Sequence, residues 1–301
     1  MTSSQPTGLG SGHGFGSGHG FGFGGPAPAP TAARIMDYLS GGRATHPLDE
    51  RILAELTAAA PGAARAARAQ HGFRRLVVAR LASRGVRQFL DLGCGLSDPE
   101  TGRGRPDVHE VAQGVDRSCR FAYVDDDVTA PARARALRGC ACAYKHGSGC
   151  DSDSGYGSVA VLAADPMSSG ILLHPQVASV LDLRRPVAVL MVGLTARIPH
   201  QRSAANLVAD LAAQTPPGSY LALSQPVSTD AGVREDVSAI VSAATGRAWR
   251  VRPPAAVEAL LTGLDVRSPG WGDVAAWGAI REPWLPRAET AYAEYGALAR
   301  T

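Results

Sequence analysis

Apolar residues recur along this chain in two patterns that alternate, namely short continuous runs and runs with helical spacing. Continuous runs predict strands buried on both faces, because such strands have no polar side. They occupy residues 86–92, 121–124, 159–163, 187–192 and 218–223. Between and after them, residues 108–115, 130–137, 204–213 and 233–245 have the spacing of amphipathic helices. The alternation predicts an α/β fold with a Rossmann-like, doubly wound and mostly parallel sheet.

The predicted organisation has an N-terminal part, a main domain and a C-terminal end. Residues 1–30 are rich in Gly, Ser, His and Pro, and too few side chains can be buried there to offset the ordering entropy, so a disordered tail is expected. Residues 31–85 form an N-terminal helical extension and a candidate lid. The main domain covers 86–285, with a flexible insertion at 139–157, and 286–301 is a C-terminal tail or helix.

Composition narrows the class of protein. The net charge of +3 is not gathered into basic stripes, so no nucleic-acid partner is expected. Five cysteines, an odd number, favour a reduced and cytoplasmic protein. No apolar run approaches the roughly 20 residues of a membrane span, so no membrane partner is expected. Composition leaves the oligomeric state open.

Acidic residues follow three of the predicted strands. Asp91, Asp125 and Asp165 come at or just after the ends of the first, second and third strands. Ligands of open parallel sheets bind beyond the carboxyl ends of the strands, so these acids are expected in one neighbourhood. There, Asp125 can accept hydrogen bonds from two ribose hydroxyls, and Asp165 can accept one from an adenine amine.

A glycine loop follows the first strand. Gly93 and Gly95 allow the backbone to approach a ligand closely. The third glycine of the dinucleotide fingerprint is missing, because residues 96–98 are Leu, Ser and Asp, and Pro99 disfavours a helix starting there. An adenosine ligand without phosphates therefore fits better than NAD, and S-adenosylmethionine is the commonest such ligand.

Several segments together resemble an actinobacterial family of S-adenosylmethionine-dependent methyltransferases, once a domain of unknown function. The family is typified by Tyr-Asp-Tyr-Leu-Leu-Gly-Gly-Lys, which here is Met36-Asp37-Tyr38-Leu39-Ser40-Gly41-Gly42-Arg43. The resemblance covers roughly residues 31–280. Its other matching segments are 87–93, 109–113, 123–127, 164–165, 185–190 and 217–224.

The resemblance implies a methyltransferase of Rossmann-like fold that uses S-adenosylmethionine to methylate an unidentified, small-molecule acceptor. The cofactor contacts it implies are Asp91, Gly93, Gly95, Asp125, Asp165, Tyr38, Gly41 and Gly42. His109 and Glu110 are the candidates for the acceptor pocket. Methyl transfer is an in-line displacement that depends on holding donor and acceptor in line, so no catalytic base is nominated.

Departures from the family pattern keep two alternatives open. Pro166-Met167-Ser168, Ala196-Arg197 and Gln225 stand where the family has Arg-Asp-Pro, His-Phe and His. These changes fall in the substrate half, and they motivate a catalytically degenerate, cofactor-binding regulatory or sensing protein. An NAD(P)-dependent oxidoreductase is the second alternative.

Structural roles also compete with the ligand roles. The strand-end acids could cap turns, His109 and Glu110 could begin an ordinary helix, and Gly41 and Gly42 could end one. Cys140, Cys142, His146 and Cys150 lack the paired spacing of structural zinc sites, so no metal is expected. Three C-terminal tryptophans, at 271, 277 and 284, are expected in core packing or at a pocket rim.

Overall fold

The fold is built on one eight-stranded sheet. The computed structural model describes residues 30–42, 47–96, 106–127, 157–277 and 291–301. The strand order is β3-β2-β1-β4-β5-β8-β6, and β7 pairs with β8. The strands are β1 (Gln88–Leu92), β2 (Arg120–Asp125), β3 (Val159–Ala163), β4 (Ala188–Val192), β5 (Tyr220–Ser228), β6 (Asp265–Val266), β7 (Gly272–Asp273) and β8 (Tyr292–Arg300).

Strands β1 to β5 are parallel, and the direction in which the chain moves across the sheet reverses once. From β1 the chain continues to β2 and β3 on one side and then returns to β4 and β5 on the other. Such a reversal leaves a crevice at the carboxyl ends of β1 and β4, because the connections leave these strands in opposite directions. The predicted α/β class and mostly parallel sheet are therefore confirmed.

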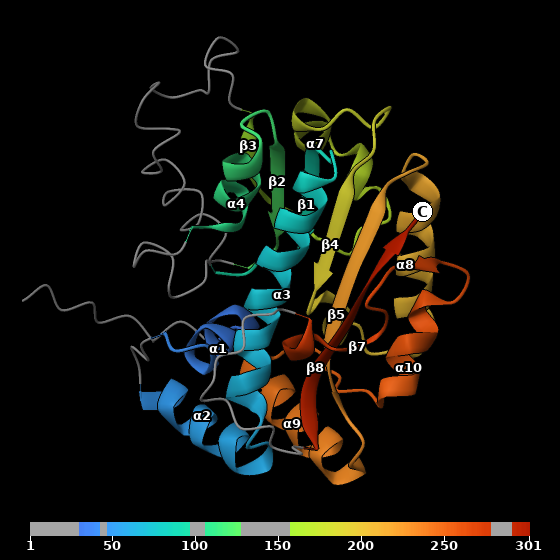
Figure 1. The fold of residues 1–301 in the computed structure, drawn as a ribbon. Coiled ribbons are helices and arrows are strands. Elements are labelled where there is room, and N and C mark those ends of the chain that lie inside the picture. Colours follow the sequence, from blue (N-terminus) through green and yellow to red (C-terminus); the bar gives the residue numbers. More distant parts are fainter. Residues whose placement is uncertain (1–29, 43–46, 97–105, 128–156, 278–290) are drawn as a thin grey trace, which may run out of the picture.

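Helices cover both faces of the sheet (Figure 1). On one face, Phe73 of α3 (Ala63–Ser83) and Ala112 of α4 (Val108–Val115) share one apolar cluster with Phe89 and Phe121. On the other face, residues from α7 (Pro175–Val180), α8 (Gln201–Gln214) and α10 (Pro254–Glu258) share one apolar cluster with Leu90. Phe89 and Leu90 thus belong to opposite cores, which explains why β1 has no polar side.

A third group of helices gathers beyond the carboxyl ends of the parallel strands (Figure 1). It comprises α1 (Ala32–Leu39), α2 (Pro47–Ala59) and α9 (Ala231–Thr245). Ile35, Leu56 and Val241 share one apolar cluster there with Trp249. The segment predicted as an N-terminal extension is therefore helical and lies next to the crevice, with α2 packed on α9 and α1 packed on α2 and α3.

The C-terminal end differs from the prediction. Residues 286–301 were expected as a tail or helix outside the domain, but β8 runs antiparallel to β5 across nine residue pairs, from Tyr220↔Arg300 to Ser228↔Tyr292. The boundary at 285 is therefore wrong, because β8 belongs to the central sheet. The expected helix at 130–137 lies outside the described residues.

Close packing between β8 and β5 gives a testable prediction. A Cβ at Gly296 would come within 2.7 Å of the Leu223 carbonyl oxygen and 2.8 Å of the Ser224 Cβ. Gly296→Ala is expected to lower the free energy of unfolding by about 2 kcal/mol, measured by urea denaturation. Gly272, its cross-strand partner, is the matched control, since a Cβ there meets nothing within 4 Å. Equal losses in both variants would contradict the packing argument.

Candidate functional site

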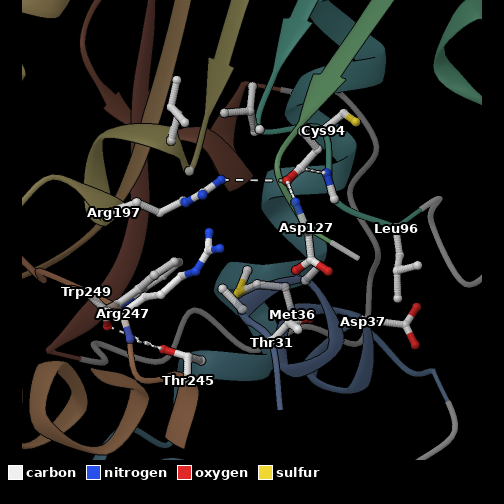
Figure 2. A pocket seen from close by; sticks show the side chains of 18 of the residues that line it. Thr31, Met36, Asp37, Cys94, Leu96, Asp127, Arg197, Thr245, Arg247 and Trp249 are labelled. Atoms are coloured by element: carbon white, nitrogen blue, oxygen red, sulfur yellow. Dashed lines mark hydrogen bonds and ion pairs between the residues drawn. The ribbon is translucent and has the colours of Figure 1, made fainter. Parts of the chain in front are cut away.

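A pocket opens at the crevice where the strand order reverses (Figure 2). Its floor and one wall come from the loops that follow β1, β2 and β4, and helix α3 adds the residues at 70, 71 and 74. The opposite wall comes from α1 and from the segment after α9. In full, the lining residues are 30–33, 36, 37, 70, 71, 74, 93–96, 125–127, 192–194, 197, 245 and 247–249.

The loop after β1 has a backbone that favours glycine at two positions. Gly93 and Gly95 have φ angles of +70° and +59°, in the left-handed region that side chains disfavour. A Cβ on Gly93 would also come within 3.0 Å of the Leu194 side chain. Both glycines line the pocket, so the loop presents main chain where other residues would present side chains.

Asp125 ends β2 and fixes this loop. Its Oδ2 accepts a hydrogen bond from the Gly95 nitrogen at 2.7 Å, and its Oδ1 accepts one from the Asp127 nitrogen at 2.9 Å. Burial raises the pKa of Asp125, although these hydrogen bonds and the nearby Arg197 oppose the shift. A buried carboxyl group with known orientation therefore lines the pocket beside the glycine loop.

Two arginines missed by the sequence reasoning complete this side of the pocket. Arg197, in the 3-10 helix Leu194–Arg197 after β4, pairs with Asp126 and lies 3.7 Å from the Asp125 Oδ1. Arg247 follows α9 and pairs with the other Asp126 oxygen at 2.6 Å. In the sequence, Arg197 stands out only as a departure from a family pattern, and nothing there indicates that Arg247 reaches Asp126.

The departure at Gln225 has a structural role. Its Oε1 accepts a hydrogen bond from the Thr195 hydroxyl at 2.7 Å, and its Nε2 donates one to the Arg250 carbonyl at 2.9 Å. The Arg250 nitrogen in turn donates to the Ala196 carbonyl at 2.7 Å. Gln225 is fully buried, and it joins the segments that carry Arg197 and Arg247 without lining the pocket itself.

The other strand-end acids lie elsewhere. Asp91 is fully buried beneath the glycine loop, with its Oδ2 3.6 Å from the Arg74 Nε, and it does not line the pocket. Asp165 is exposed after the edge strand β3, where it accepts a hydrogen bond from the Met167 nitrogen at 2.9 Å. Of the three acids, only Asp125 lines the pocket, so the expectation that all three share one neighbourhood is corrected.

The α1 segment faces the pocket with residues other than those expected. Met36 and Asp37 line it, whereas the Tyr38 hydroxyl points to Asp49, to which it donates a hydrogen bond at 3.0 Å. Gly41 ends α1 with a φ of +111°, and neither Gly41 nor Gly42 lines the pocket. Gly41 and Gly42 therefore have the helix-stop role that the sequence left open as an alternative. Within α1, Tyr38 points away from the pocket because successive helical residues face different directions.

His109 and Glu110 form the start of helix α4, which is the structural role that competes with a place in the acceptor pocket. The Glu110 side chain accepts a hydrogen bond from the Asp107 nitrogen at 2.7 Å, which completes a capping box with Asp107. The backbone nitrogen of His109 donates to the Tyr123 hydroxyl at 3.0 Å, and the His109 side chain is buried. Neither residue is part of the pocket lining.

A buried polar network lies next to the pocket. Glu294 of β8 accepts hydrogen bonds from the Ser224 hydroxyl at 2.6 Å and from the Gln70 amide at 3.2 Å. Gln70 also lines the pocket. Complete burial raises the pKa of Glu294 to about 8, although both hydrogen bonds and the charge of Arg74 oppose the shift. Sequence reasoning missed Glu294 because it assigned its segment to a tail.

Comparisons with known proteins agree with this architecture. The model of a family described as S-adenosyl methyltransferase matches residues 27–301. A candidate methyltransferase from Thermobifida fusca has a similar structure, with a TM-score of 0.73, 27% sequence identity, and coverage of 91% of this chain and 95% of that one. A DUF574 family protein from Streptomyces avermitilis has a TM-score of 0.75 and 28% identity, and the match covers 91% and 98%. No curated protein matches this sequence.

Two further structural findings concern membranes and metals. In the part of the chain that the structure describes, no helix is both long enough and apolar enough to cross a bilayer. Among those same residues, no group of three or more His, Cys, Asp or Glu side chains is placed to hold a metal ion. Cys140, Cys142, His146 and Cys150 lie outside the described residues.

The buried Glu294 predicts a pH-dependent stability. Its pKa is about 8 in the folded chain and near 4.5 when exposed, so between these values only the folded state holds the proton. The free energy of unfolding should therefore fall as pH rises from about 5 to 9, by a few kcal/mol in order of magnitude. Glu294→Gln keeps the acceptor oxygen and should flatten this dependence in urea denaturation series. An unchanged slope in the variant would show that other groups cause it.

Proposed function

Since this chain belongs to the S-adenosyl methyltransferase family and uses S-adenosylmethionine as its methyl donor, we propose that the pocket between β1, β2 and β4 is its active site. The acceptor is a small molecule that enters from the side of α1 and the segment after α9. The observation that carries the proposal is the pairing of Asp125 with the Gly95 nitrogen at the point of strand reversal. This hydrogen bond joins the glycine loop to the acid that ends β2, and these are the two features expected of an adenosine site.

The residues present fit the cofactor. The left-handed Gly93 and Gly95 leave main chain at the pocket surface, and Asp125 offers carboxylate oxygens with remaining lone pairs to ribose hydroxyls. The lining carries acids and arginines together, and Asp126 is paired with both Arg197 and Arg247, so its charge is largely balanced within the pocket. We assign cofactor contact to Gly93, Gly95 and Asp125, and structural support to Asp91, Tyr38, Gly41 and Gly42.

The chemistry requires little from side chains. When bound, S-adenosylmethionine would supply a methyl group that its sulfonium activates for in-line displacement, with S-adenosylhomocysteine as the leaving group. The protein's task is to position the two reactants, a contribution that reaches several kcal/mol when the geometry is right. Met36 and Leu194 contribute apolar surface to the pocket, which helps to exclude water from the reacting atoms. We also propose that α1, which carries Met36 and Asp37, acts as a lid over the pocket.

Calorimetric titration of the full chain with S-adenosylhomocysteine tests the proposal, and a parallel titration with NAD tests the oxidoreductase alternative. Binding of the first and not of the second is expected. Formation of S-adenosylhomocysteine from S-adenosylmethionine in the presence of a small-molecule cell extract then separates an active enzyme from a regulatory relative. Tight binding of NAD would overturn the assignment of the pocket.

Asp125→Asn tests the ribose contact. The amide keeps an oxygen for the Gly95 nitrogen but loses the charge, so affinity for S-adenosylhomocysteine should fall at least tenfold. Asp210→Asn, the same change on the exposed face of α8, is the matched control and should leave affinity unchanged. Because the pKa of Asp125 is raised, wild-type affinity should also begin to weaken at a higher pH than for an ordinary aspartate as the solution is acidified. Equal affinity of both variants would remove Asp125 from the site.

A further inference from the structure

Helix α3 presents the Gln70 side chain to the pocket. Arg74, one turn further along the helix, also lines the pocket, but its guanidinium group donates to two backbone carbonyls and its charge is paired with Asp91. Among the described residues, the Gln70 side chain makes one hydrogen bond, from its Nε2 to the Glu294 Oε1 at 3.2 Å. Gln70 therefore keeps hydrogen-bonding capacity for a ligand.

The available end of the Gln70 amide is its oxygen. No described residue donates a hydrogen bond to Gln70 Oε1, and this oxygen is not one of the fully buried side-chain atoms that lack a partner, so it is accessible. Gly193 of the pocket lining lies against the amide, since a Cβ there would come within 2.6 Å of the Gln70 Nε2 and 3.8 Å of its Oε1. The pocket thus has a neutral acceptor beside the turn after β4.

Glu294 fixes the orientation of this amide. An amide has one donor end and one acceptor end, so a partner that accepts from the nitrogen directs the oxygen elsewhere. The Glu294 Oε1 is such a partner, and it also accepts from the Ser224 hydroxyl at 2.6 Å. Glu294 is buried and does not line the pocket, so it acts on the pocket surface through Gln70.

The Gln70 amide and the Asp125 carboxylate lie toward different neighbours of β1. Asp125 ends β2, whereas Gln70 contacts Gly193 after β4, and β1 with its glycine loop lies between these two strands. A cofactor whose ribose is held by Asp125 can extend along the glycine loop toward β4. Its far end is an amino acid, which carries an ammonium group.

We propose that Gln70 accepts a hydrogen bond from the ammonium group of the cofactor's amino-acid end, and that Glu294 is the positioning residue that directs the Gln70 oxygen to it. The inference rests on the proposed function, since it places the ribose at Asp125. An amide oxygen suits this partner because a hydrogen bond from a charged donor is stronger than one between neutral groups.

Two ligands test the contact. S-adenosylhomocysteine carries the ammonium group, whereas its deamino analogue keeps the carboxylate and lacks the ammonium. In calorimetric titrations of the full chain, Gln70→Met should weaken binding of S-adenosylhomocysteine at least tenfold and leave binding of the analogue unchanged. Equal losses for the two ligands, or no loss, would overturn the proposal.

Gln113→Met is the matched control. Gln113 of α4 is buried to nearly the same extent as Gln70, and its amide donates to two backbone carbonyls, but it does not line the pocket. The variant should leave the affinity for both ligands unchanged. A loss as large as that in Gln70→Met would show that removing any buried amide weakens binding, and the contact would be rejected.

A double-mutant cycle tests the positioning role. Glu294→Met removes the acceptor of the Gln70 nitrogen, so it should weaken S-adenosylhomocysteine at least fivefold in the wild-type background and add no loss in Gln70→Met. Glu294→Gln keeps an acceptor oxygen and should retain the wild-type affinity at pH 7, where Glu294 itself is mostly protonated because burial raises its pKa to about 8. Additive losses, or equal losses in both Glu294 variants, would reduce Glu294 to a structural role and overturn this part.

Failure of the proposed function gives a different result. If the pocket is not the cofactor site, the wild-type chain does not bind S-adenosylhomocysteine, whereas failure of this inference leaves wild-type binding intact and changes only the comparison between ligands and variants. Urea denaturation of each variant shows whether it is folded. Gln70→Met and its control decide the contact by themselves if Glu294→Met does not fold.

Discussion

The pocket depends on one buried cation, Arg74. Its Nη1 donates to the Cys94 carbonyl at 3.0 Å and its Nη2 to the Val192 carbonyl at 3.4 Å, while Asp91 lies 3.6 Å from its Nε. Helix α3 is thereby joined to the ends of β1 and β4, the two strands that flank the reversal. A charge buried this deeply is tolerated only when it is paired, and Asp91 provides the opposite charge. The same guanidinium group holds the Cys94 carbonyl, so the shape of the glycine loop depends on this pair.

Charged pairs also build the rim of the pocket. The Gly95–Asp125 hydrogen bond links the loops after β1 and β2, and Asp126 links β2 to Arg197 after β4 and to Arg247 after α9. These contacts join segments from four parts of the chain around one cavity. Because Arg247 is largely exposed, its pair with Asp126 contributes little to stability.

Most of the fold followed from local patterns. The strand at residues 187–192 was predictable because burial on both faces forces every position to be apolar. Strand β8 escaped prediction for the opposite reason, since its buried positions include Gly296, Ala297 and Ala299, which carry little hydrophobic signal. Small residues are needed there because β5 and Val274 pack so closely on Gly296.

The sequence by itself determined the class of fold, the glycine loop and Asp125 as a pocket residue, because a buried strand, its turn and the acid that ends it are local features. Only the tertiary structure decided which residues meet there. It turned Asp91 inward to Arg74, directed Tyr38 to Asp49, and brought Arg247 to Asp126 across 121 positions. A side chain's direction depends on what packs against its element, and that information is distributed over the whole chain.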